Sequence, residues 1–129
     1  MEKRIYRPLE TVSAEEVKRI IAWGTEEERG LLPLQVGEYG RYWAQSQAVC
    51  LKLLEDDSPV VRANAALGLG YIARTQGQLD KRLVKPYLLR ELRENDAYRW
   101  RIIDAINDID LFLGWRLGEK ALPKYEEQS

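Results

Sequence analysis

The segment from Asp57 to Arg74, DSPVVRANAALGLGYIAR, is followed 39 residues later by a similar segment, DAYRWRIIDAINDIDLFL, from Asp96 to Leu113. The aligned pairs include Asp57 with Asp96, Val61 with Trp100, Arg62 with Arg101, Ala66 with Ala105, Leu67 with Ile106 and Ile72 with Leu111. A fixed period of about 40 residues in a helical pattern is typical of stacked helix pairs. Because such units bury their apolar faces mainly against neighbouring units, the repeat predicts a short all-α solenoid.

This pattern resembles the HEAT-repeat family, whose second helix tends to open with an Asp, then a Val-Arg pair, then an Ala-rich stripe. The resemblance implies helix pairs that serve mostly as binding surfaces and only occasionally as enzymes. It also implies that the Arg of one repeat pairs with the Asp of an adjacent repeat. The residues given this structural role between repeats are Arg62, Arg101, Asp57 and Asp96. Contact with a phosphate is the alternative role for the two arginines.

The whole chain is expected to be one domain of residues 1–129. Residues 1–37 are expected to form an N-terminal cap, in which a helix starts at Ser13 and the stretch 31–40 is a loop, because it holds a proline and two glycines. The expected repeats are residues 38–77, with helices at about 39–55 and 59–75, and residues 78–118, with helices at about 80–94 and 96–113. Residues 119–129 are the expected tail, disordered from Pro123.

The composition argues against several partners. Twenty basic and 21 acidic residues give a net charge of −1, so there is no bulk attraction to nucleic acid or to an anionic membrane. No stretch approaches the roughly 18 apolar residues of a membrane span, and the N-terminus lacks a secretory pattern. The single cysteine, Cys50, lies in an apolar run and fits a reducing compartment. The expected location is the cytoplasm.

The chain contains no histidine, which removes several chemistries. Neither a Ser-His-Asp nor a Cys-His arrangement can form, and one cysteine cannot supply a zinc site. Carboxylates are the remaining candidates for a general base, and only where burial raises their pKa. We therefore expect no enzymatic activity, no metal, no cofactor and no small-molecule substrate.

The second copy of the repeat is more polar than the first. Asp104 and Asp108 stand where the first copy has Ala65 and Leu69, and they lie four residues apart on one helical face, with Asp110 nearby. Like charges at this spacing repel each other. Three interpretations follow: a solvated terminal face with Asp104 paired to Arg101, an acidic patch that binds a basic partner, or a catalytic carboxylate pair.

The aromatic residues are four Trp and seven Tyr against one Phe. Trp and Tyr commonly anchor interfaces. Trp23, Trp43 and Trp100 are expected to fill the core, whereas Tyr71 and Tyr98 are expected to reach the surface and flank the acidic patch. Stacking of aromatic and Arg side chains on nucleic-acid bases is the alternative, and the net charge disfavours it.

Protein binding is the function that these features favour. In size and architecture the chain looks like the immunity proteins of bacterial toxin systems, some of which are similar to short HEAT-type arrays. That resemblance implies a stoichiometric inhibitor that covers a toxin nuclease domain, with Asp104 and Asp108 facing its basic cleft. The alternatives are a HEAT-like nucleic-acid-binding protein or DNA glycosylase-type enzyme, and a HEAT-like subunit that guides a modifying enzyme or lyase.

Overall fold

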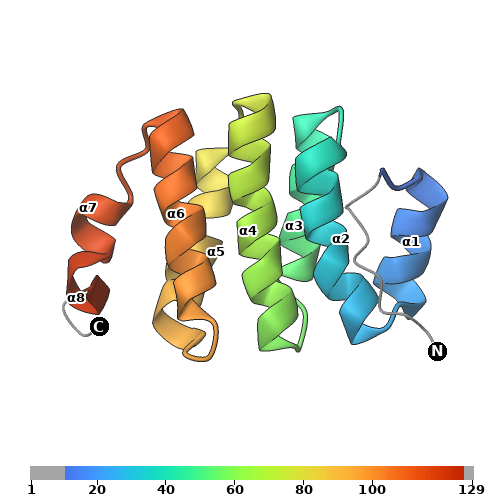
Figure 1. Cartoon of the computed structure of the whole chain (residues 1–129), viewed down its shortest axis with the longest axis horizontal. Helices are drawn as coiled ribbons and strands as arrows, with labels where there is room; N and C mark the ends of the chain where they lie inside the picture. The colour runs from blue at the N-terminus through green and yellow to red at the C-terminus, as the bar shows by residue number, and fades with distance from the viewer. Residues whose placement is uncertain (1–10, 127–129) are drawn as a thin grey trace, which may run out of the picture.

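The computed structural model describes residues 11–126, and this part of the chain is all-helical, without a strand. Helices α2, α4 and α6 lie side by side, with α3 and α5 behind them, α1 at the N-terminal end and α7 and α8 at the other (Figure 1). The helices are α1 (Ala14–Trp23), α2 (Glu26–Tyr39), α3 (Trp43–Leu53), α4 (Pro59–Gln76), α5 (Lys81–Glu94), α6 (Arg99–Leu113), α7 (Gly118–Ala121) and α8 (Pro123–Glu126). The all-α class is therefore confirmed for the described residues.

Local sequence signals set most of the helix ends. At the start of α2, the Thr25 side chain accepts from the backbone of Glu28, and the Glu28 side chain accepts from the backbone of Thr25, which satisfies two free amides. Helix α4 begins with Ser58 as the cap and Pro59 in the first turn. It ends at Gly77, whose φ of 68° is the left-handed conformation that glycine adopts without strain.

Helix α4 occupies the centre of the row and packs on both neighbours. A Cβ atom at Gly68 would lie 2.5 Å from the Pro33 carbonyl oxygen of α2, so only glycine allows this approach. On the other side, a Cβ atom at Gly70 would lie 3.4 Å from Ala105 of α6. Gly68 thus lets α4 approach α2 closely, whereas a Cβ atom at Gly70 would make an ordinary contact with α6, and neither glycine belongs to a phosphate-binding loop.

The loop expected over residues 31–40 is wrong, because α2 runs continuously to Tyr39. Its helix breakers form a contact face instead. Gly30, Pro33 and Gly37 are buried, and they recur at the spacing of one helical side. A Cβ atom at Gly37 would lie 2.6 Å from the Gly68 carbonyl oxygen, so this small-residue face is what brings α2 against α4. The boundary expected at residue 37 falls inside α2.

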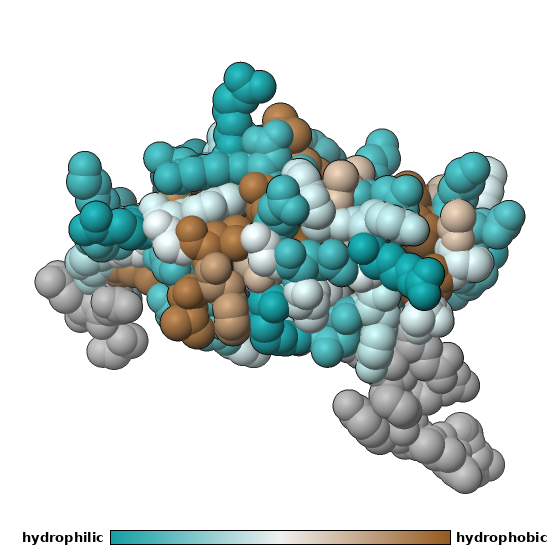
Figure 2. Space-filling view, turned by 90° about the horizontal axis from the view of Figure 1, so that it is seen from above, coloured by the Kyte–Doolittle hydropathy of each residue, from teal (hydrophilic) through white to brown (hydrophobic). Residues whose placement is uncertain are grey.

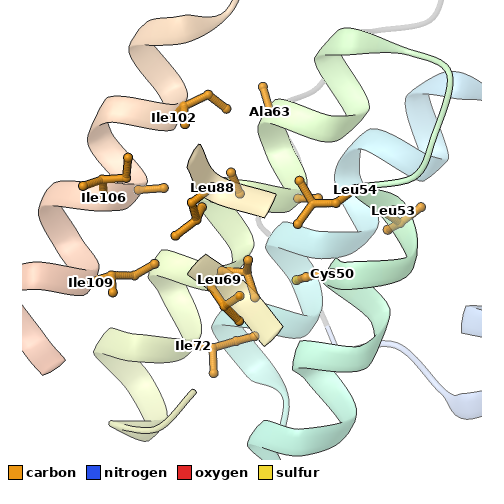
Figure 3. Packing of buried hydrophobic residues seen from close by; sticks show 14 of the residues in the cluster. Cys50, Leu53, Leu54, Ala63, Leu69, Ile72, Leu88, Ile102, Ile106 and Ile109 are labelled. Carbon is orange, nitrogen blue, oxygen red and sulfur yellow. The ribbon is translucent and has the colours of Figure 1, made fainter. Parts of the chain in front are cut away.

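The hydrophobic core lies between the two layers. In Figure 3, Ile102, Ile106 and Ile109 of α6 point toward Leu88 of α5 and the side chains of α4. Cys50 lies in the same core, fully buried, and this burial raises the pKa of its thiol, so the side chain remains neutral.

The tail is more ordered than expected. Gly118–Ala121 form α7 and Pro123–Glu126 form α8, and Leu117 and Leu122 beside them are 7% and 3% exposed. Disorder from Pro123 is therefore wrong for residues 123–126. Residues 127–129, and residues 1–10 of the expected N-terminal cap, lie outside the described part of the chain.

Candidate functional site

Helix α6 has one buried side and one exposed side. Its buried residues are Ile102, Ala105, Ile106 and Ile109. The exposed residues on the opposite side follow the i, i+4, i+7, i+11 spacing of a single helical line, and we call them the α6 stripe: Trp100, Asp104, Asn107 and Leu111. The counterparts of these four residues in α4, Val61, Ala65, Gly68 and Ile72, are buried, whereas on the side of α6 away from α4 only the short helices α7 and α8 follow and the stripe stays exposed.

Two carboxylates form the acidic part of this surface. Asp104 is exposed, and Asp108, one turn further, is half-buried beside Gly70 of α4. Within residues 11–126 neither carboxylate forms an ion pair. The pairing of Asp104 with Arg101 that the sequence suggested is absent there, and the Arg101 guanidinium bonds instead to Asn64 of α4. Both negative charges are thus available to a partner.

Asp110 differs from the other two aspartates because its carboxylate is already bonded. Its two oxygens accept from the backbone amides of Leu117 and Gly118, both at 2.8 Å. These bonds hold the chain at the start of α7. Asp110 therefore stabilises the turn after α6 and offers less to a partner than Asp104 does.

Arg101 is held in place by three groups. Its Nη1 donates to Asn64 Oδ1 at 2.7 Å, and its guanidinium carbon lies 5.0 Å from the ring centres of both Tyr98 and Trp100. Asn64 in turn donates to the Gly30 carbonyl oxygen at 2.9 Å. This chain of contacts joins α6 to α4 and α4 to α2 along one face of the molecule.

The tyrosines proposed as flanking anchors are each paired with an arginine. Tyr71 of α4 is half-buried, with the Arg74 guanidinium 4.7 Å from its ring centre, and Arg74 also pairs with Glu38 of α2. Tyr98 is half-buried under Arg101. Tyr71 lies on the α2 side of α4, where a Cβ atom at Gly37 would come within 2.8 Å of its own Cβ atom, so it does not flank the aspartates of α6.

The tryptophans differ from expectation. Trp23 is 84% exposed and Trp100 is 58% exposed, so their assignment to the core is wrong, whereas Trp43 is partly buried against it. Leu111 is 74% exposed although its repeat partner Ile72 is buried. The sequence carried one signal for this difference: Trp100 replaces a Val at a position where a core repeat has no room for an indole.

The repeat arginines bind other acceptors than those expected. Arg62 Nε lies 3.1 Å from both carboxylate oxygens of Glu91 in α5, and its Nη1 donates to the Asp56 and Asp57 carbonyl oxygens. The ion-pair partner is thus a glutamate, and the expected pairing with an Asp of the adjacent repeat is wrong for this residue. Asp96 pairs locally with Arg99 at 2.6 Å.

A concave region lies at the other end of the molecule. A groove of about 610 Å³ runs between α1, α2 and α3, with Val17, Val36, Tyr39 and Tyr42 among its walls. Its rim includes Thr11, which adjoins residues outside the described part of the chain. The polar substitutions that distinguish the second repeat copy lie on α6, and this groove lies at the opposite end of the row of helices.

Two further features are absent from the described residues. Among residues 11–126, no three His, Cys, Asp or Glu side chains gather in a group that could hold a metal ion. No helix in that part is both long and apolar enough to cross a membrane.

Comparison with known proteins gives a structural neighbour and no family. No protein-family model matches the chain, and no curated protein is significantly similar in sequence. A chain in the crystal structure of a CDI complex from Cupriavidus taiwanensis LMG 19424 is similar in fold, with a TM-score of 0.71 and 21% identity. The match covers 85% of this chain and 98% of that chain, so it includes nearly the whole of the neighbour.

Proposed function

We propose that this protein is a stoichiometric binder of a bacterial toxin domain, an immunity protein that acts in the cytoplasm and has no catalytic activity of its own. The observation that carries the proposal is the likeness to a chain of a CDI complex over almost all of that chain. CDI denotes contact-dependent inhibition, in which a toxin and an immunity protein form a pair.

The surface chemistry of the chain supports the same role. Trp100 on α6 is exposed, and Trp is a residue that commonly anchors protein interfaces. Seen from above, hydrophobic side chains also gather in the left half of the molecule (Figure 2), the half in which α6 lies in Figure 1. Asp104 and Asp108 add negative charge that would speed association with a basic toxin domain. The row α2, α4, α6, backed by α3 and α5, is consistent with a short α-solenoid of HEAT-like helix pairs.

Co-expression tests this function directly. The protein encoded by the gene next to this chain in its source genome should arrest growth when expressed alone, and should be harmless when this chain is expressed with it. The two purified proteins should form a complex of one copy each, measured by light scattering after gel filtration. Continued growth arrest despite full expression of this chain, with no complex, contradicts the proposal.

A nucleic-acid-binding or glycosylase-type function has less support. Arg99 and Arg101 lie beside aromatic rings, but Arg99 is bonded to Asp96 and Arg101 to Asn64. The unpaired carboxylate of Asp104 lies within one turn of Arg101 and would repel a phosphate backbone. Retention of the chain on a DNA or RNA oligonucleotide at about 0.15 M salt would favour this alternative.

A further inference from the structure

We propose that the α6 stripe is the docking surface, and that the bound segment of the toxin carries a cationic side chain between two apolar ones. This inference rests on the proposed function and specifies its partner. Trp100 and Leu111 are the apolar anchors, and Asp104 pairs with the cation. The sequence pattern pointed to the carboxylates, whereas the structure adds the anchors on both sides of them.

The exposure of the two anchors is the first argument. Trp100 is 58% exposed and Leu111 is 74% exposed, and Phe112 beside Leu111 is 45% exposed. Two large apolar side chains on one line of a helix cost solvation free energy that a partner would recover on binding. The anchors lie eleven positions apart in the sequence, which corresponds to about 16 Å along the helix, a length that fits within an interface of ordinary size.

The rigidity of Trp100 is the second argument. The Arg101 guanidinium lies 5.0 Å from its ring centre and is itself fixed by Asn64 at 2.7 Å. Because Asn64 also bonds to Gly30 of α2, the indole rests on groups connected to the centre of the molecule. An anchor that is already ordered loses less conformational entropy when the partner binds.

Charge determines which partner fits. Asp104 and Asp108 lie one turn apart and have no cationic partner within residues 11–126. If two copies of this chain paired through their stripes, their carboxylates would approach each other, so the charge disfavours a second copy. A Lys or Arg on the toxin would instead neutralise Asp104 in the middle of the interface.

The anchors are tested with the toxin domain from the co-expression experiment. Trp100→Ala and Leu111→Ser should each weaken binding roughly tenfold or more, mainly through faster dissociation. Trp23→Ala is the matched control, because Trp23 is a still more exposed indole on α1 at the opposite end, and it should bind as wild type does. Leu111→Ser removes no core contact, so it stays informative even if Trp100→Ala lowers the melting temperature.

The cation is tested through association rates. Asp104→Asn should slow association several-fold at low salt, and added salt should slow the wild type toward the variant. Glu15→Gln, which removes an exposed charge from α1, is the control and should change the rate little.

The outcomes separate this inference from the function on which it rests. If wild type binds the toxin while Leu111→Ser and Asp104→Asn bind with wild-type affinity and rate, the stripe is not the docking surface, although the function stands. If wild type fails to bind, the proposed function itself is wrong. A free protein that sediments as a dimer, and as a monomer after Leu111→Ser, would assign the stripe to a second copy and overturn the inference.

Discussion

Glu91 of α5 accepts several side-chain hydrogen bonds, including those that join α5 to α4. Its side chain is 2% exposed and accepts from Arg62 of α4, from Arg90 and from Asn95. A buried carboxylate is tolerated only when such donors surround it. The position carries no repeat signature, so the sequence could indicate that Arg62 bonds to a neighbouring element but not which acid receives it.

Removal of the Arg62 side chain should therefore lower stability. We expect Arg62→Ala to reduce the free energy of unfolding by roughly 1–3 kcal/mol, because Glu91 loses a charged donor while it keeps Arg90. Arg62→Lys should lie between wild type and Ala, since one ammonium cannot bond both Glu91 and the Asp56 and Asp57 carbonyl oxygens, as Nε and Nη1 of the guanidinium do. Urea unfolding measures all three proteins, and equal midpoints would show that the bond contributes nothing. Toxin affinity of the folded variants should change little.

Asp56 should make stability depend on acid. Burial alone would raise the pKa of Asp56, but hydrogen bonds from Arg29 at 2.7 Å and from the Ser58 amide at 3.0 Å outweigh burial and lower it. Because the folded pKa is depressed, the stabilisation is present above about pH 4 and disappears as the pH falls through the folded value. The melting temperatures of wild type and Asp56→Asn should differ at pH 7 and converge near pH 2. Asp57→Asn, at an exposed carboxylate, is the control.

At the scale of the helix, the contact between α2 and α4 depends on glycine. We expect Gly68→Ala to destabilise the protein by roughly 1–3 kcal/mol, because the added methyl would meet the Pro33 carbonyl oxygen at 2.5 Å and Cys50 Sγ at 2.9 Å. Gly70→Ala meets its nearest atoms at 3.4 Å and gains helix propensity, so its cost should be much smaller. Thermal unfolding compares the two variants. Equal losses would mean that α2 can move away from α4 easily.

The helices that were predicted well carry local signals. Ser58 and Pro59 mark the start of α4, and Gly77 and Gly114 mark the ends of α4 and α6. Helix α2 was not predicted because Pro33 and Gly37 weaken an isolated helix. Packing against α4 offsets this effect, and α4 lies more than 20 residues away in sequence. Tertiary packing decided that element, and periodicity could not reveal it.

The candidate site was predicted only in part, because tertiary packing also decides which of its residues are exposed. The pattern located the polar helix of residues 99–113, because its aspartates break the repeat. It placed Trp100 in the core, since a Trp in an apolar helix is usually buried. Whether Trp100 and Leu111 face a neighbour or the surface depends on whether another helix covers α6, and the replacement of Val61 by Trp100 in the second copy is the one sequence signal that bears on it.

At the scale of the whole molecule, one core joins the helices, so unfolding should be cooperative. Far-ultraviolet circular dichroism should show an α-helical spectrum without β character. Helix content and tryptophan fluorescence should change in a single coincident transition on heating, because α4 shares its buried side chains with α2, α3 and α6. Two separate transitions would mean that the two helix pairs unfold independently.

The central position of α4 has a consequence for a divided chain. A cut between Gly77 and Asp80 leaves α4 in one fragment without the neighbour that Gly70 faces, and leaves α5 and α6 in the other without the helix on which they pack. The fragment with α5 and α6 should be largely unfolded alone, whereas the fragment that ends at Gly77 keeps the contacts of α4 with α2 and α3. When the purified fragments are mixed, they should reassociate and recover the helical spectrum of the intact chain. Under the proposed function, cells should be protected from the toxin only when both fragments are produced. Because both halves of the core depend on α4, the intact fold should thus form only when the two fragments associate.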